Sequence, residues 1–273
     1  MTGSGGDTGC SVAVMQPYFF PYLGYFQLLA HVDVFVVYDD TQYVKRSWIN
    51  RNRILENGVA AYLTLPVIAG SHRQLICEKR LHEPRSRQPK LLKRVRRAYH
   101  AAPHLDSVSA LLEPLFLGAD ETIACFNIRA LRALQAFLGL RTRLVLASER
   151  AYPRCGTAQE RIIRICLEEG GARYINPIRA RSLGLYDQAA FTAAGLELSY
   201  LSTDTDVRYD QNGRTFVPDL SVIDVLMFNS PAQTRELLDR YVLRPPQSPG
   251  AVSDIESSPP RPLGIPLDDR ETG

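Results

Sequence analysis

Two adjacent aspartates, followed by several basic and amide side chains, form the part of the sequence with the clearest capacity for chemistry. Asp39 and Asp40 come directly after the β-prone run 34–38, and the residues that follow supply further polar groups: Gln42, Lys45, Arg46, Asn50, Arg51 and Arg53. Lysine binds a phosphate or carboxylate as a point charge, and arginine does so through a planar fork. A nearby carboxylate can accept a proton from an amine or a hydroxyl, or hold a metal. The alternative is that the aspartates cap a turn and the basic residues form a solvated face.

A second candidate is the aromatic loop at residues 15–27. It contains Gln16 and three tyrosines that could line a pocket, Tyr18, Tyr22 and Tyr25. The loop has no strong acid, base or nucleophile, so we expect it to shape the pocket and hold the ligand while the segment 39–53 supplies the charge. Both segments follow predicted strands, and ligands of open α/β sheets bind at the carboxyl ends of strands. If the two strands are neighbours, both segments open on the same edge of the sheet.

Three other places could bind a ligand or take part in chemistry. The segment 79–97 is rich in lysine and arginine, with few acids beside them in the sequence, so it could contact RNA phosphates or a polyanionic partner. The alternative is a solvated helix face, and no interleaved aromatic residues indicate base stacking. Cys155 precedes a predicted helix, and a helix N-terminus can lower a thiol pKa and so make the thiol a nucleophile. The alternative is that Cys155 is a buried or incidental cysteine without a role in chemistry.

Asp224 interrupts an apolar helical stripe at residues 220–229. An acid in such a stripe lies at the edge of the core or is paired. It could orient basic side chains of the segment 39–53 or bind a substrate amine, and a structural cap or salt bridge is the alternative. Asn176, at the end of another predicted strand, is a further candidate ligand-binding residue.

The elements that must position these residues alternate along the chain. Strands are predicted at 12–15, 34–38, 61–65, 143–147, 173–175 and 196–201, and helices at 23–30, 89–100, 107–138, 157–169, 186–194, 220–228 and 231–242. This order predicts an α/β fold with a mostly parallel, Rossmann-like sheet, helices on both faces and a helical C-terminal part. We expect one folded domain at 11–243, with disorder at 1–10 and in the Pro/Ser-rich tail 244–273.

Composition restricts the class of protein. The chain has 273 residues, 45% hydrophobic and 22% charged, which is typical of a globular domain with a real core. A net charge of +3 does not by itself imply nucleic acid. The five cysteines form no C-x-x-C pair, which argues against a disulfide framework and a zinc site. No apolar run has the length of a membrane span, and the first residues are unlike a secretory signal, so we expect a cytoplasmic protein without a membrane partner.

The stretches 15–27, 38–54 and 220–229 resemble the WbqC-like protein family, and the likeness covers most of residues 11–240. That family occurs in surface-polysaccharide and natural-product gene clusters, and a glycine transferase role has been suggested for it. The resemblance therefore implies modification of an amino sugar or another amine. Members usually carry a glycine pair after Asn-Pro, whereas Asn176-Pro177 is followed here by Ile178-Arg179-Ala180-Arg181. This departure adds positive charge and puts the substrate choice at this loop in doubt.

These observations lead to a specific hypothesis. The protein is predicted to be a transferase of polysaccharide, antibiotic or other natural-product biosynthesis that moves an acyl group, glycyl or aminoacyl, onto an amine of a sugar nucleotide or a precursor. Asp39 or Asp40 would act as general base, with Lys45 as a further catalytic residue. The substrate would contact Gln16, Tyr18, Tyr22, Tyr25, Gln42, Arg46, Asn50, Arg51, Arg53, Asn176 and Asp224.

The hypothesis leaves the acyl donor open. An activated amino acid, a thioester or aminoacyl-tRNA would serve, and the segment 79–97 would suit a carrier protein or aminoacyl-tRNA. The residues assign no metal site and name no cofactor, and they leave a covalent intermediate on Cys155 open. The alternative function is a non-catalytic RNA- or nucleotide-binding module that uses the same basic surface.

Overall fold

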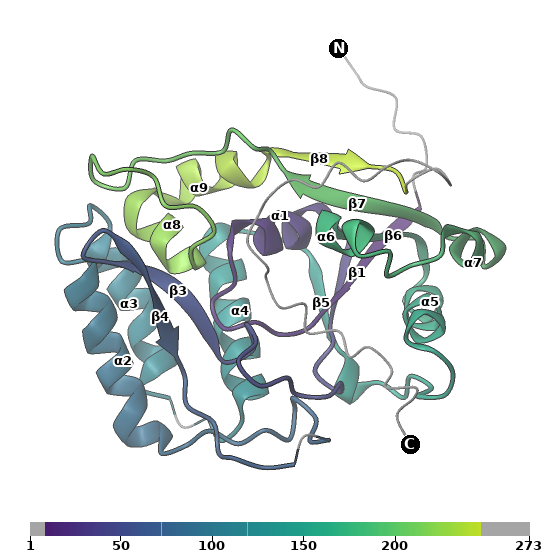
Figure 1. Cartoon of the computed structure of the whole chain (residues 1–273), viewed down its shortest axis with the longest axis horizontal. Coiled ribbons are helices and arrows are strands. Elements are labelled where there is room, and N and C mark those ends of the chain that lie inside the picture. Colours follow the sequence, from purple (N-terminus) through teal and green to yellow (C-terminus); the bar gives the residue numbers. More distant parts are fainter. Residues whose placement is uncertain (1–8, 72, 119, 247–273) are drawn as a thin grey trace.

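A computed structural model describes residues 9–71, 73–118 and 120–246 (Figure 1). Its largest feature is a six-stranded sheet of order β5-β2-β1-β6-β7-β8. Five strands run parallel: β1 (Cys10–Met15), β2 (Val34–Val37), β5 (Arg143–Leu146), β6 (Gly171–Pro177) and β7 (Glu197–Thr203). The last strand, β8 (Tyr241–Arg244), pairs antiparallel with β7. The predicted mostly parallel sheet is confirmed, while the predicted disordered ends fall largely on residues 1–8 and 247–273, outside the described residues.

Helices cover both faces of the sheet, as predicted. The side chains of β1 alternate between two cores, because successive residues of a strand point to opposite faces. Ala13 and Met15 belong to a large core, and Val12 and Val14 to a smaller one. The large core includes α1 (Leu23–His31), α4 (Ile123–Leu138) and α9 (Pro231–Leu238), and the smaller one includes α5 (Ala158–Glu168), α6 (Ile178–Ser182) and α7 (Gln188–Ala193).

A β-hairpin stands apart from the main sheet, beside α2 (Pro84–Ala98), α3 (Leu105–Phe116) and α8 (Val222–Phe228) (Figure 1). It consists of β3 (Arg51–Glu56) and β4 (Val59–Thr64), which pair antiparallel. The turn residues Asn57 and Gly58 both have positive φ, 54° and 82°, which is typical of two-residue hairpin turns. The predicted strand at 61–65 therefore exists, but it belongs to the hairpin, and the residues 51–56 predicted as loop form its partner.

Several predicted boundaries were wrong. The helix predicted at 107–138 is two helices, α3 and α4, and Thr122 caps the second by accepting a hydrogen bond from the backbone N–H of Cys125. The last predicted helix ends at Leu238, because residues 241–244 pair with the edge of β7. The capping box predicted for Thr157 and Glu160 is confirmed. Among the described residues, no helix is both long and apolar enough to cross a bilayer.

Candidate functional site

The carboxyl ends of β1 and β2 lie side by side, as the sequence predicted. Met15 is in register with Val37, and the backbone N–H of Tyr38 donates to the carbonyl of Met15 over 2.8 Å. The chain runs from β1 outward to β2 and β5, and then returns to β6 on the other side of β1. The carboxyl ends of β1 and β6 therefore form the topological switch point, which is the usual place of ligand sites in open α/β sheets.

Asp39 is buried and fully engaged with the turn after β5. Its two carboxylate oxygens accept hydrogen bonds from the backbone N–H of Ser148 at 2.9 Å and from the Ser148 hydroxyl at 2.6 Å. Burial raises the pKa of Asp39, and the bonds from Ser148 oppose this shift. Both oxygens are thus used to join the end of β2 to the turn after β5.

Asp40 is also buried but uses only one of its oxygens. Arg161 of α5 donates to Oδ2 over 2.5 Å, and Arg154 lies 3.4 Å from the same atom. The Arg161 guanidinium stacks over the ring of Tyr38 at 4.8 Å. Asp40 Oδ1 is buried and has no hydrogen-bond partner among the described residues. An ion-paired carboxylate with an unused oxygen can accept an N–H or O–H from a ligand.

Gln16 presents a second unused acceptor at the same edge. Its Nε2 donates to Thr41 Oγ1 over 3.2 Å, and that hydroxyl in turn donates to the carbonyl of Tyr38 over 3.3 Å. Because a hydroxyl has a single proton, Thr41 must accept from Gln16, which sets the orientation of the amide. Gln16 Oε1 is then buried without a partner in the described part of the chain. We call Gln16, Thr41, Asp40 and Arg161 the acceptor site.

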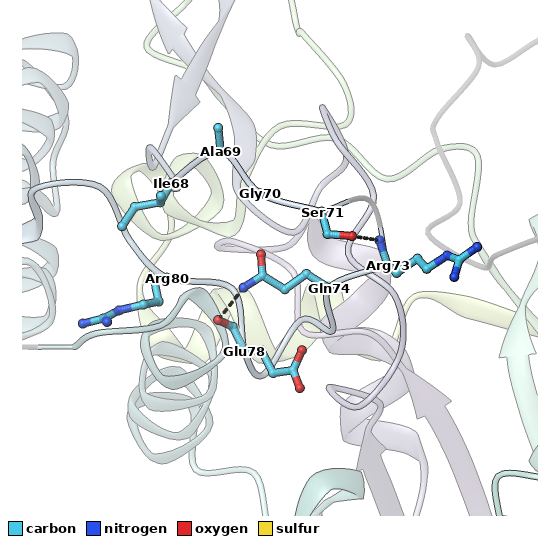
Figure 2. A pocket seen from close by; sticks show the side chains of 8 residues that line it. All are labelled: Ile68, Ala69, Gly70, Ser71, Arg73, Gln74, Glu78 and Arg80. Atoms are coloured by element: carbon cyan, nitrogen blue, oxygen red, sulfur yellow. Dashed lines mark hydrogen bonds between the residues drawn. The ribbon is translucent and has the colours of Figure 1, made fainter.

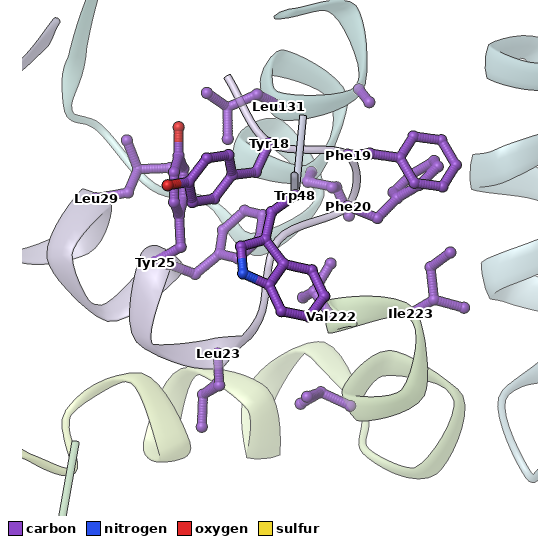
Figure 3. Packing of buried hydrophobic residues seen from close by; sticks show 14 of the residues in the cluster. Tyr18, Phe19, Phe20, Leu23, Tyr25, Leu29, Trp48, Leu131, Val222 and Ile223 are labelled. Atoms are coloured by element: carbon purple, nitrogen blue, oxygen red, sulfur yellow. The ribbon is translucent and has the colours of Figure 1, made fainter. Parts of the chain in front are cut away.

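The aromatic loop packs its side chains into the large hydrophobic core (Figure 3). Tyr25 is fully buried, and its hydroxyl donates to the backbone carbonyl of Gln16 over 3.0 Å. Tyr18 is buried in the same core, and Tyr22 is half-buried and forms an isolated bridge with Ser221. Phe19 and Phe20 are fully buried as well. The loop is therefore largely core structure, and Tyr25 fixes the backbone from which Gln16 extends.

Three polar side chains hold the backbone of this buried loop, a role that the sequence did not reveal. Asn52 donates to the carbonyls of Phe19 and Phe20 over 3.2 and 2.7 Å, and Ser221 also donates to that of Phe20 over 2.8 Å. Asn127 donates to the carbonyls of Pro17 and Ile49 over 2.9 and 2.8 Å. Buried carbonyls require such partners. An asparagine inside the apolar stripe of the predicted helix 107–138 was a signal that could have revealed Asn127.

The polar side chains of the segment 42–53 differ in what they contact: some bind other parts of the chain, and others are exposed. Asn50 accepts from the Tyr43 hydroxyl at 3.0 Å and donates to the carbonyl of Leu65 at 3.1 Å, and Arg53 donates to the carbonyl of Asp219 at 3.0 Å. Gln42 forms an isolated bridge with Leu75. In contrast, Lys45 and Arg46 are exposed. Asn50 and Arg53 therefore join segments of backbone in this structure.

Two further candidates, Asp224 and Asn176, have tyrosine partners. Fully buried Asp224 accepts from the hydroxyls of Tyr99 and Tyr209 at 2.8 and 2.6 Å and from Gln211 Nε2 at 2.8 Å. The expected arginine or lysine partner is not among these groups, and burial raises the pKa of Asp224. Asn176 lies at the end of β6, beside the switch point, and donates to the hydroxyls of Tyr174 and Tyr186.

The basic segment 79–97 is partly neutralised by glutamates, most of them from elsewhere in the chain. Glu56 of β3 pairs with Arg94 at 2.7 Å and with Arg97 at 3.3 Å. The remaining pairs are Arg96 with Glu113, Arg87 with Glu83 and Arg80 with Glu121. The sequence suggested few offsetting acids because three of these four glutamates lie outside the segment. The exposed charge that an RNA or a carrier could meet is correspondingly smaller.

An open hollow of about 400 Å³ lies next to this segment, in the loop between β4 and α2 (Figure 2). Its lining residues are Ile68, Ala69, Gly70, Ser71, Arg73, Gln74, Glu78 and Arg80. Gln74 Nε2 donates to the carbonyl of Glu78 over 3.0 Å, and this hydrogen bond joins two of the lining residues. None of the residues predicted to form the site lines this hollow.

Comparisons with known proteins agree with the resemblance noted in the sequence. The model of the WbqC-like protein family matches residues 16–236. The uncharacterized protein Rv1507c of Mycobacterium tuberculosis is 32% identical over 232 residues, which cover 84% of this chain and 97% of that protein. No solved structure gives a significant match. The matched residues include the acceptor site and the side chains that hold the aromatic loop.

Proposed function

The chain belongs to the WbqC-like protein family, and on this premise we propose that it is a transferase that acylates an amine. The acyl group is glycyl or another aminoacyl group, and the acceptor is a sugar nucleotide or a natural-product precursor. One observation carries the proposal: two buried acceptor oxygens, Asp40 Oδ1 and Gln16 Oε1, have no partner among the described residues. Both lie at the carboxyl edge of the sheet, and an amine is a ligand group that can donate to both.

The proposed reaction assigns Asp40 the role of general base. The amine nitrogen attacks the acyl carbonyl carbon, and a C–N bond forms as the bond from that carbon to the donor's ester oxygen or thioester sulfur breaks. The proton released from nitrogen passes to Asp40 Oδ1 and then to the leaving group. Asp39 is less suited to this role because Ser148 occupies both of its oxygens. Arg161 and Arg154 would keep Asp40 in place through Oδ2.

The exposed Lys45 and Arg46 would bind the phosphate or carboxylate of the donor or the acceptor. The basic segment 79–97 remains a proposed contact for a carrier protein or aminoacyl-tRNA. Its exposed members without an ion pair among the described residues, Arg85, Lys90 and Lys93, would provide that contact.

The proposal is tested by mixing the protein with an amino-sugar nucleotide and with glycyl-tRNA, a glycyl thioester or glycyl adenylate, and by detecting the amide by mass spectrometry. Asp40→Asn should lower the rate about 100-fold or more, because general base catalysis contributes on that order. Asp106→Asn is the matched control, because Asp106 is an exposed aspartate of α3, outside the acceptor site. The proposal fails if no donor is consumed, or if Asp40→Asn retains the parent's rate within about threefold.

A further inference from the structure

A second group of polar side chains lies around Tyr43 and Tyr62, and its members are all hydrogen-bond donors with unused N–H groups. The Lys79 ammonium is 5.0 Å from the centre of the Tyr43 ring. The Arg51 guanidinium is 4.4 Å from the centre of the Tyr62 ring, and Trp48 lies 6.3 Å from that ring on a centre-to-centre measure. Lys45 follows Tyr43 by two residues and lies close enough to Lys79 to lower its pKa, an effect that burial of Lys79 dominates. We call Lys45, Trp48, Arg51 and Lys79 the donor cluster.

Lys79 is the unusual member of this cluster. Only 2% of its surface is exposed, yet no acid lies within ion-pair distance among the described residues. Its ammonium has three N–H groups, and it donates one hydrogen bond, to Gln74 Oε1 at 3.2 Å. A buried ammonium is costly without an opposite charge. The partners that the described residues give this ammonium are neutral, Gln74 Oε1 and the face of the Tyr43 ring, and the neighbouring Lys45 adds positive charge.

The other members of the cluster lack acceptors too. Within the described part of the chain, neither Lys45 nor Arg51 has an ion pair, and the buried Nε of Arg51 and Nε1 of Trp48 have no hydrogen-bond partner. One cation thus lies over each tyrosine ring, Lys79 over Tyr43 and Arg51 over Tyr62, and Lys45 lies near Lys79. Unused N–H groups beside positive charges favour an anionic acceptor as ligand.

The open hollow of Figure 2 is lined by two residues that lie close to the Lys79 ammonium. Gly70 and Gln74 both line it. A Cβ added at Gly70 would lie 3.4 Å from Lys79 Nζ and 2.8 Å from Gln74 Oε1. The ammonium is therefore close behind the wall of the hollow, where the Gln74 amide is its hydrogen-bond partner. An anion that enters here can replace Gln74 Oε1 as the acceptor.

We propose that the donor cluster is a binding site for an oxyanion, with a phosphate group preferred over a carboxylate because the cluster contains three cationic side chains. Lys79 is the central ligand, and Lys45 and Arg51 add charge. This inference rests on the proposed function in one respect, namely that the bound anion is a group of a substrate or donor. Anion binding itself requires no transfer reaction, so the two proposals can fail separately.

Trp48 is the only tryptophan of the chain, so its fluorescence reports on this site. The experiment titrates the full chain with inorganic phosphate at constant ionic strength, with chloride as the reference salt and acetate in a separate arm. Phosphate should change the emission in a saturable way, and chloride should not. Acetate that saturates as tightly as phosphate would identify the bound group as a carboxylate.

Lys79→Met should weaken phosphate binding about tenfold or more, which corresponds to loss of a charged hydrogen bond. Arg132→Met removes an exposed arginine of α4 and should leave binding unchanged. Lys45→Ala serves as a second variant, because Lys45 is exposed and its loss should not disturb folding. An emission change that chloride reproduces, or that persists unaltered in both Lys79→Met and Lys45→Ala, overturns the proposal. Amide formation that fails while phosphate binds would refute only the transferase.

Discussion

Replacing Asn127 by alanine should destabilise the protein strongly, although this side chain touches no proposed ligand. Asn127 is 1% exposed, and its Nδ2 is bound to the carbonyls of Pro17 and Ile49 at 2.9 and 2.8 Å. Asn127→Ala leaves both carbonyls without this partner, and each unsatisfied buried group costs about 1–3 kcal/mol. The expected loss in the free energy of unfolding is therefore about 2–5 kcal/mol, a large part of the total stability of a typical domain.

Thr234→Val provides the contrasting case. Thr234 is fully buried too, but its hydroxyl has no hydrogen-bond partner among the described residues. Valine has nearly the same shape, so this change removes an unpaired polar group and should alter stability by about 0.5 kcal/mol or less, or increase it. Urea unfolding followed by circular dichroism measures both variants at equal protein concentration. The reasoning is refuted if Asn127→Ala unfolds within about 0.5 kcal/mol of the parent while Thr234→Val loses more than about 1 kcal/mol.

Three more predictions concern charge and thiols. Burial raises the pKa of Asp224 in the folded state, so the folded protein binds this proton more tightly than the unfolded chain does. Urea unfolding should therefore show the parent gaining stability relative to Asp224→Asn as the pH falls from 7 toward about 4. A stability difference that stays constant over this pH range would contradict this prediction. Arg94 and Arg97 lower the pKa of Glu56, so Glu56→Gln should reduce the free energy of unfolding by about 1 kcal/mol at pH 7. The reduction should be smaller once acid protonates Glu56 in the folded parent. An equal reduction at pH 2 would argue against a stabilising contribution from these ion pairs. Cys155 and Cys125 are exposed, and Cys166 is buried with a raised thiol pKa, so a thiol reagent should modify the first two in the native protein and Cys166 only after unfolding. Cys155→Ser should leave any transfer activity within about threefold of the parent's. Loss of activity in this variant would instead support a covalent intermediate on Cys155.

Local patterns predicted the elements of the main sheet well because each strand and helix has its own periodicity. The strands β1 and β2 and the helix α5 with its capping box follow from neighbouring residues alone. The hairpin strand β3 and the edge strand β8 were missed because both depend on their pairing partners. Residues 241–244 form a strand by pairing with β7, which local periodicity does not show.

The candidate site was predicted in position but not in detail. That Asp39 and Asp40 follow a strand adjacent to β1 was visible in the sequence. Their different roles were not, because Ser148 and Arg161 reach them from 109 and 121 residues further along the chain. The same holds for Lys79, which sequence reasoning counted among solvent-exposed basic residues and which the fold buries.

The aromatic loop shows the reverse case. Its composition suggested a ligand pocket, whereas Phe19, Phe20 and Tyr25 are fully buried in the core. The aromatic residues of this loop fill the core, and its buried backbone carbonyls accept hydrogen bonds from Asn52, Asn127 and Ser221. Of this stretch, Gln16 is the residue whose unpaired Oε1 indicates a ligand contact.

The central claim is that Asp40 and Gln16 recognise an amine at the carboxyl edge of the sheet. The most direct measurement is calorimetric titration with an amino-sugar nucleotide and with the deoxy analogue that lacks the amine. The parent protein should bind the amino compound about tenfold more tightly or better, since a site with unpaired buried acceptors discriminates against a ligand without a donor. Asp40→Asn should lose that preference, and Asp106→Asn should keep it. Equal affinity of the parent for the two compounds would contradict the claim.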